Sequence, residues 1–187
     1  MEKSVNLDTV KLIKPVRHFD KRGFFVETYT RKNLIDIGIN HEFLQDNHSL
    51  SYKKGTLRGL HFQAPPYAQA KLIMCTKGAI FDVVVDIRVG SPKFGKWQGY
   101  ELTAENGNQL YVPVGFAHGF LSMMPNSEVI YKCSEYYNKS SEMSLLWNDP
   151  DIGIKWPMEN HFILSEKDKM SPRLRDINSP FLYEKKS

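Results

Sequence analysis

Apolar residues gather in short runs along most of this chain, and turn-forming residues interrupt the runs about every eight to twelve positions. Pairs such as Lys77-Gly78 and Asn106-Gly107 mark the interruptions, and the runs are rich in β-branched and aromatic residues, which favour strands. The runs predict strands over residues 56–63, 71–76, 79–88, 99–103, 109–112, 118–123, 129–135 and 144–147. This number of short strands predicts an all-β fold, a jelly roll or barrel built from two sheets.

The N-terminal part and the C-terminal tail do not follow this regular spacing of strands and turns. Ser165 is a suitable N-cap for one helical turn, and Gly38 is a suitable residue to end a helix. The remaining elements are predicted as an edge strand or arm over 1–14, a turn over 20–23 leading into a strand, a short helix over 31–37, a strand over 43–50, a helical turn over 165–168 and frayed residues 183–187. No repeat or linker divides the chain, so a single domain over 1–187 with a few short peripheral helices is expected.

Composition narrows the classes of function. The chain has 187 residues, of which 41% are hydrophobic and 25% charged, enough for one domain with a full core. The net charge is +4 with scattered Lys and Arg, so no nucleic-acid partner is predicted, and an anionic small molecule is favoured. Cys75 and Cys133 lie in apolar runs and indicate buried thiols. With no signal peptide and no apolar run of about 18 residues, we expect a cytoplasmic protein without a membrane partner.

The stretch over residues 54–63 places Arg58 and His61 on one predicted strand. Histidine moves protons near neutral pH and the arginine fork suits phosphate, so the pair indicates an enzyme that acts on a phosphorylated metabolite. A core strand with one hydrogen-bonded histidine is an equally simple interpretation. Arg58 and His61 have opposite parity, so both reach one cavity only if the strand bulges at Gly59 or Arg58 lies at the cavity mouth.

A second stretch resembles a motif of the cupin jelly rolls: Gly107, five residues, Pro113-x-Gly115, two residues and then His118. In metal-binding cupins an earlier motif supplies His-x-His and a following glutamate. Here that motif is His61-Phe-Gln63, and no glutamate follows before residue 71. Because a first-row metal needs about three nitrogen or oxygen ligands, no metal site is predicted, and the histidines indicate proton chemistry.

Side-chain alternation groups further candidates. His61, Lys71 and Tyr131 all occupy odd positions on predicted strands, which is compatible with one shared interior. Lys71 is difficult to explain as core, since an unpaired lysine is rarely fully buried. Tyr131 is equally well a core tyrosine, and Asp168 equally well a first-turn carboxylate that the helix dipole favours. Asp82 has the opposite parity to the valine beside it, so it faces either solvent or a cavity.

Spaced motifs carry a resemblance along residues 9–175. They combine polar residues with apolar neighbours: Asp20-x-Arg22-Gly-Phe-Phe-x-Glu27, Gln45-Asp-Asn-His-Ser49, Leu57-Arg-Gly-Leu-His-Phe-Gln63, Phe81-Asp-Val-x-Val-Asp-Ile-Arg88, Gly115-Phe-Ala-His-Gly-Phe120, Trp147-Asn-Asp149 and Ser165-x-Lys-Asp168. The chain resembles the nucleotide-sugar 3,5-epimerases typified by dTDP-4-dehydrorhamnose 3,5-epimerase. The resemblance implies a cupin-type jelly-roll barrel and a cofactor-independent isomerase that inverts C3 and C5 of a nucleotide-diphospho-4-keto-6-deoxy sugar, for surface polysaccharide.

The resemblance also implies roles for individual residues. His61 is the base that removes a hydrogen beside the C4 ketone, and Asp168 orients its ring. Tyr131 is the acid on the other side of the sugar. Lys71 stabilises the enolate oxygen, and we expect it to lower the pKa of Tyr131. The substrate-binding positions implied are Arg22, Glu27, Gln45, Asn47, Arg58, His118, Tyr137, Glu142 and Lys167, with Tyr137 stacking on the base.

The family further implies a homodimer in which the N-terminal strands reach into the site of the partner. Within the class, a C3-only or C5-only epimerase and an epimerase of a GDP-linked heptose stay open. Two other classes are a metal-dependent cupin enzyme that uses His61 and His118, and a catalytically silent protein that binds sugar nucleotides. We expect neither a metal nor a cofactor.

Overall fold

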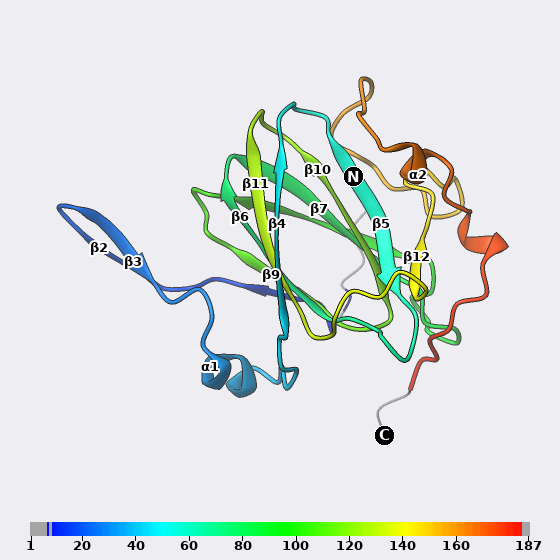
Figure 1. Ribbon diagram of the computed structural model, residues 1–187, viewed down its shortest axis with the longest axis horizontal. Helices are drawn as coiled ribbons and strands as arrows, with labels where there is room; N and C mark the ends of the chain where they lie inside the picture. Colours follow the sequence, from blue (N-terminus) through cyan, green and yellow to red (C-terminus); the bar gives the residue numbers. More distant parts are fainter. Residues whose placement is uncertain (1–6, 8, 185–187) are drawn as a thin grey trace.

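Strands dominate the computed structural model, which describes residue 7 and residues 9–184 (Figure 1). In chain order the elements are β1 (Lys11–Ile13), β2 (Arg17–Asp20), β3 (Gly23–Val26), α1 (Arg31–Asp36), β4 (Gln45–Ser51), β5 (Leu57–Gln63), β6 (Lys71–Lys77), β7 (Ala79–Asp86), β8 (Trp97–Thr103), β9 (Gln109–Val112), β10 (Phe116–Ser122), β11 (Ser127–Cys133), β12 (Glu142–Ser144), α2 (Glu166–Lys169) and the 3₁₀ turn η1 (Leu174–Asp176). Two antiparallel five-stranded sheets have the orders β1-β9-β6-β11-β4 and β12-β5-β10-β7-β8. The predicted all-β barrel is confirmed.

The inner faces of the two sheets form the main hydrophobic core. Ile73 on β6 and Leu110 on β9 come from the first sheet, and Ile80 and Val84 on β7 come from the second. All four side chains are completely buried. Because successive side chains on a strand point to opposite faces, the residues at every second position fill this interior.

Two further clusters cover the outer faces of the sheets. Leu34 of α1 packs with Leu72 of β6 and with Tyr111 of β9. On the other sheet, Leu174 and Phe181 from the C-terminal segment join a buried cluster with strands β5 and β7. Each sheet is therefore packed from both sides, as a rigid wall requires. Among the described residues no helix is long and apolar enough to cross a membrane.

Strands β2 and β3 form a separate hairpin that projects away from the barrel (Figure 1). Asp20 pairs with Gly23 at its tip, which confirms the predicted turn. At its base, the Arg17 guanidinium donates hydrogen bonds of 2.6 and 2.7 Å to two backbone carbonyls after β8. Phe19 and Phe25 are 72% and 68% exposed, so the hairpin presents a large apolar surface.

The last predicted strand is wrong in its position. It was expected over 144–147, whereas β12 covers Glu142–Ser144. Leu145 still exchanges backbone hydrogen bonds with Leu60 of β5, but the Leu146 N–H donates to the Pro172 carbonyl at 2.8 Å. The chain thus leaves the sheet toward the C-terminal segment, a tertiary contact that the local pattern does not encode.

The predictions for the two ends of the chain are partly confirmed. β1 is an edge strand paired with β9, as expected, although residues 1–6 and 8 lie outside the described part. The expected fraying is wrong at Tyr183, whose N–H donates to the Val89 carbonyl at 2.9 Å. Residues 185–187 lie outside the described residues. The predicted first helix and its end at Gly38 are confirmed.

A bulge interrupts the pairing of β5 with β10. His118 lies opposite His61, and Phe120, two positions later in β10, lies opposite Arg58, three positions earlier in β5. One extra residue in β5 therefore changes the parity, as the first of the two predicted arrangements at Gly59 requires. The bulge brings Arg58 and His61 to the same cavity.

Replacing the bulge glycine is expected to lower the free energy of unfolding. Gly59 has a φ of +124°, and an added Cβ would lie 2.6 Å from the Cα of Gly119. We expect Gly59→Ala to cost about 2–4 kcal/mol, because the neighbouring backbone must shift. Gly90→Ala is the matched control, since Gly90 has a φ of +84° with open space around it and should cost only about 1–2 kcal/mol. Urea denaturation measures both losses, and equal losses would contradict the packing argument.

Candidate active site

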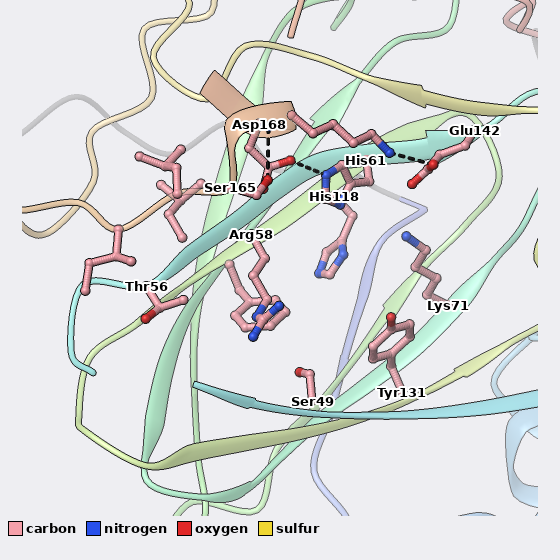
Figure 2. Close-up of a pocket in the computed structure, with 15 residues that line it drawn as sticks. Ser49, Thr56, Arg58, His61, Lys71, His118, Tyr131, Glu142, Ser165 and Asp168 are labelled. Atoms are coloured by element: carbon pink, nitrogen blue, oxygen red, sulfur yellow. Dashed lines mark hydrogen bonds and ion pairs between the residues drawn. The ribbon is translucent and has the colours of Figure 1, made fainter. Parts of the chain in front are cut away.

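A cavity of about 460 Å³ lies between the two sheets, where polar side chains replace the apolar core (Figure 2). Residues of β5 and β10 line one wall, and residues of β6 and β11 line the other. The predicted site residues that the structure brings together here are Arg58, His61, Lys71, His118, Tyr131, Glu142, Lys167 and Asp168. The cavity can thus hold an anionic ligand among several titratable groups.

His61 is paired with a carboxylate from the C-terminal segment. Its Nε2 lies 2.6 Å from Oδ1 of Asp168, which is only 4% exposed (Figure 2). Ser165 is the N-cap of α2, as predicted, and its hydroxyl accepts the Asp168 N–H at 3.1 Å. The hydrogen bond occupies Nε2, so a proton taken from a ligand would go to Nδ1.

The environment keeps Asp168 ionised. Burial is the largest single effect and acts to raise the pKa of this carboxyl group, whereas the hydrogen bond and the charge of His61 lower it. Ser165 and the Gly59 N–H add to the lowering, and the pKa lies below its ordinary value of 3.8. The carboxylate can therefore orient the imidazole and stabilise it when it becomes a cation.

Lys71 and Tyr131 lie on the opposite wall from His61. Tyr131 on β11 is paired with Ile73 on β6, two positions from Lys71, so the two side chains are diagonal neighbours on the inner face. Figure 2 shows the ammonium and the hydroxyl directed into the cavity. The wall opposite His61 therefore carries an amine and a phenol.

The expected effect of Lys71 on Tyr131 is wrong. Burial raises the pKa of the Tyr131 hydroxyl, and the positive charge that acts against this is that of Arg58. Burial lowers the pKa of the Lys71 ammonium, whereas its interactions with Cys133, Asp82 and Glu142 raise it. The bulge brings Arg58 into the cavity, and its charge thus makes the pKa of the Tyr131 hydroxyl rise less than burial alone would.

His118 forms a second histidine–carboxylate pair, with a partner to which the sequence assigns no role. Its Nε2 lies 2.9 Å from Oδ2 of Asp82, which is completely buried. Among the described residues the other oxygen of Asp82 has no hydrogen-bond partner. Burial raises the pKa of Asp82, and His118 lowers it. The alternation of side chains could have placed Asp82 in the interior. Asp82 lies on the same face of β7 as Ile80 and Val84, which belong to the core.

A smaller hollow of about 150 Å³ adjoins the cavity and contains the remaining predicted residues of the barrel, Gln45, Asn47 and Tyr137. The Tyr137 hydroxyl donates to Oε2 of Glu142 at 3.1 Å, and Nζ of Lys167 lies 2.5 Å from the same oxygen. The Tyr137 N–H donates to the Gln45 side chain at 2.9 Å. Tyr137 is therefore held at two points, its hydroxyl and its backbone N–H.

Two predicted residues do not reach this cavity. Arg22 and Glu27 lie on or directly after the projecting hairpin. The Arg22 side chain is 84% exposed and pairs with Asp20, and Glu27 accepts a hydrogen bond from Thr30. Within the described residues no three His, Cys, Asp or Glu side chains are grouped so that they could hold a metal ion.

Comparison with known proteins places these features in a family. The family model described as dTDP-4-dehydrorhamnose 3,5-epimerase matches residues 4–176. A dTDP-4-dehydrorhamnose 3,5-epimerase of Sinorhizobium fredii is 48% identical over 186 residues, which cover 97% of this chain and 93% of that protein. The crystal structure of a Legionella pneumophila dTDP-6-deoxy-D-glucose-3,5-epimerase in complex with dTDP-4-keto-L-rhamnose has a TM-score of 0.92, with 41% identity and 97% of each chain covered.

A more distant structure broadens the comparison. ChmJ, a 3′-monoepimerase from Streptomyces bikiniensis in complex with dTDP-quinovose, has a TM-score of 0.83 and 36% identity. The match covers 89% of this chain and 84% of that one. The same barrel is therefore found in a protein described as inverting a single centre.

Asp168→Asn should remove a pH-dependent part of the stability. Because the folded-state pKa of Asp168 is below its ordinary value of 3.8, its contribution is present above about pH 4 and is lost as the pH falls through the folded pKa. The wild type should thus keep its stability advantage over the variant near neutral pH and lose it as the pH falls below about 4. Urea denaturation at stepped pH measures this, and a constant difference across the range would contradict it.

Proposed function

This chain belongs to the dTDP-4-dehydrorhamnose 3,5-epimerase family, and we propose that it inverts C3 and C5 of a dTDP-4-keto-6-deoxy sugar without a cofactor. The observation that carries the proposal is the placement of His61 and Tyr131 on opposite sheets around one cavity. Inversion requires a proton to leave from one face of the sugar ring and to return to the other. A base and an acid on facing walls meet this requirement.

The first step of the proposed reaction is removal of a carbon-bound proton. The C4 ketone acidifies the hydrogens on C3 and C5. His61 accepts one of them, and the electron pair of the broken C–H bond forms a C=C bond while the C4 oxygen becomes negative. Asp168, ionised beside the ring, stabilises the imidazolium that results.

The second step returns a proton to the opposite face. Lys71 stabilises the enolate oxygen by its positive charge, which can be the largest single catalytic contribution. Tyr131 donates its hydroxyl proton to carbon, and the enolate electron pair forms the new C–H bond as the carbonyl reforms. Water then reprotonates the phenolate and takes the proton from His61. Burial raises the pKa of Tyr131, and the charge of Arg58 partly offsets this rise and so supports the phenolate.

The remaining residues in the proposal bind the nucleotide and the sugar. Arg58 holds the diphosphate, and its guanidinium is fixed by a 3.0 Å hydrogen bond to the Leu50 carbonyl. His118 orients the sugar, and Tyr137 stacks on the base. The other binding positions proposed from the family are Gln45, Asn47, Glu142 and Lys167.

We also propose that the protein is a homodimer in which each β2–β3 hairpin enters the cavity of the partner. Arg22 and Glu27 lie outside the cavity of their own chain, so exchange of the hairpin would give them a role. The exposed Phe19 and Phe25 supply the apolar surface that such an interface needs. We place the enzyme in the cytoplasm, where thiols such as the buried Cys75 stay reduced.

A C3-only epimerase is the second candidate. The Streptomyces bikiniensis relative described as a 3′-monoepimerase shares 36% identity with this chain. Base and acid serve both reactions, and the number of carbons that invert depends on how the sugar turns in the cavity. Analysis of each carbon separately decides between the two.

Incubation with dTDP-4-keto-6-deoxyglucose in deuterium oxide should place deuterium on C3 and C5. His61→Ala should slow the exchange by at least about 100-fold, because the general base is lost. Tyr131→Phe should retain exchange while product inversion falls, since only the acid is removed. NMR of the sugar measures both processes. Absence of exchange with dTDP-, GDP-, UDP- and CDP-linked 4-keto sugars, in folded protein, would refute the proposed function, and label on C3 alone would select the second candidate.

The exchanged hairpin predicts complementation between two inactive variants. His61→Ala damages the barrel site, and Arg22→Ala damages the hairpin. In a mixed dimer, both defects fall in one site and the other site is intact, so mixing after unfolding and refolding should restore about one quarter of the wild-type activity. Restoration of none would contradict exchange, provided that light scattering confirms the mixed dimer. Monomers in solution would contradict the dimer itself.

A further inference from the structure

The short strand β12 connects the base to the segment that carries its carboxylate. Ser144 lies opposite His61 on β5, and Glu142 lies opposite Gln63. Glu142 and Ser144 are two positions apart, so their side chains share one face of the strand. Each contacts the segment around α2, and the two contacts lie on either side of Asp168 in the sequence.

These two contacts are short and polar. Oε2 of Glu142 lies 2.5 Å from Nζ of Lys167, the residue before Asp168 (Figure 2). The hydroxyl of Ser171, three residues after Asp168, donates to the Ser144 hydroxyl at 2.9 Å. Asp168 is therefore held between two links to a strand that is itself in register with His61.

The α2 segment depends on such links. It has four residues, Glu166–Lys169, and a single helical turn is not stable by itself in water. The Ser165 cap fixes its local shape but not its place on the barrel. Backbone hydrogen bonds between Ile163 and β5, and between Leu146 and Pro172, anchor the chain further away. The Gly59 N–H reaches the carboxylate only at 3.5 Å, so the contacts on either side of Asp168 contribute to its position.

We propose that Glu142, Lys167, Ser144 and Ser171 are positioning residues, which hold Asp168 in hydrogen-bonding contact with His61. This inference rests on the proposed function for the catalytic role of the pair. The Tyr137 hydroxyl donates to the same oxygen of Glu142 that pairs with Lys167. One carboxylate thus joins Tyr137 to Lys167, the residue before Asp168.

The proposal gives Lys167 a function besides contact with a phosphate. In this structure its ammonium is neutralised by Glu142, and that carboxylate would repel a diphosphate placed on the same side. A role in positioning acts without substrate, whereas a role in phosphate binding acts only with it. A measurement on the free protein therefore separates the two.

The test is the exchange of the His61 Nε2 proton with water, followed by NMR on protein with ¹⁵N-labelled histidine and no ligand. A proton held in a short hydrogen bond to a carboxylate resonates downfield and exchanges slowly. Lys167→Gln should speed the exchange by at least about tenfold, because the hydrogen bond opens more often. Lys167→Arg keeps the ion pair and should restore the slow exchange.

Lys169→Gln is the matched control. Lys169 lies on the same helix, carries the same charge and pairs at 2.6 Å with Glu166 of that helix. Its replacement should leave the exchange rate of the His61 proton at the wild-type value. Equal rates for Lys167→Gln, Lys169→Gln and the wild type would overturn the proposal.

Ser171→Ala provides a second variant that changes no charge. It removes the other link and should also speed the exchange, whereas an unchanged rate would contradict the part of the proposal that concerns Ser144. If Lys167→Gln does not fold, as judged by thermal unfolding, Ser171→Ala decides the outcome with the same signal. Because no substrate is present, failure of the epimerase assay does not affect this readout, and the two proposals fail independently.

Discussion

The separation of the two sheets is the constraint on which the rest of this structure depends. Facing sheets pack about 10 Å apart, a gap that is filled by apolar side chains or, where these are absent, by a ring-sized ligand. His61 stands on one wall and Tyr131 on the other. Helix α1 and the C-terminal segment cover the outer faces of the walls, so the gap is set by packing on both sides. A site that inverts a carbon centre needs two groups held on opposite walls, so the fixed distance between the sheets matters more than any single side chain.

The bulge at Gly59 shows how a local departure from regular structure serves the site. In a regular strand Arg58 and His61 would point to opposite faces, and the arginine would leave the interior. The extra residue reverses the parity, and the glycine permits the close approach to Gly119 that this requires. The consequence is electrostatic, because the charge of the arginine then opposes the rise that burial causes in the pKa of Tyr131.

The two histidine–carboxylate pairs have similar contacts and different surroundings. The Asp168 carboxylate accepts hydrogen bonds from the Gly59 N–H and from His61, Ser165 also lowers its pKa, and that pKa is held low. Asp82 is completely buried with His118 as its partner, and burial raises its pKa. The first pair therefore keeps a carboxylate beside His61, as the proposed role of that residue as a base requires. The second pair is more deeply buried, and Asp82 fixes the ring of His118 at the wall of the cavity.

The alternation of apolar and polar residues and the turn-forming residues determined most of the strands, because both are local properties of the sequence. The spacing of the motifs determined the family. The same sequence left open whether Arg58 and His61 meet, gave Asp82 no role, and attributed to Lys71 an effect on Tyr131 that belongs to Arg58. It also placed β12 too late, because Leu146 pairs with a segment far along the chain. Pairing register, burial and distances between strands arise only when remote segments pack together. Local pattern therefore specified most of the strands, and the tertiary structure alone decided which polar residues meet and in which direction each pKa is shifted.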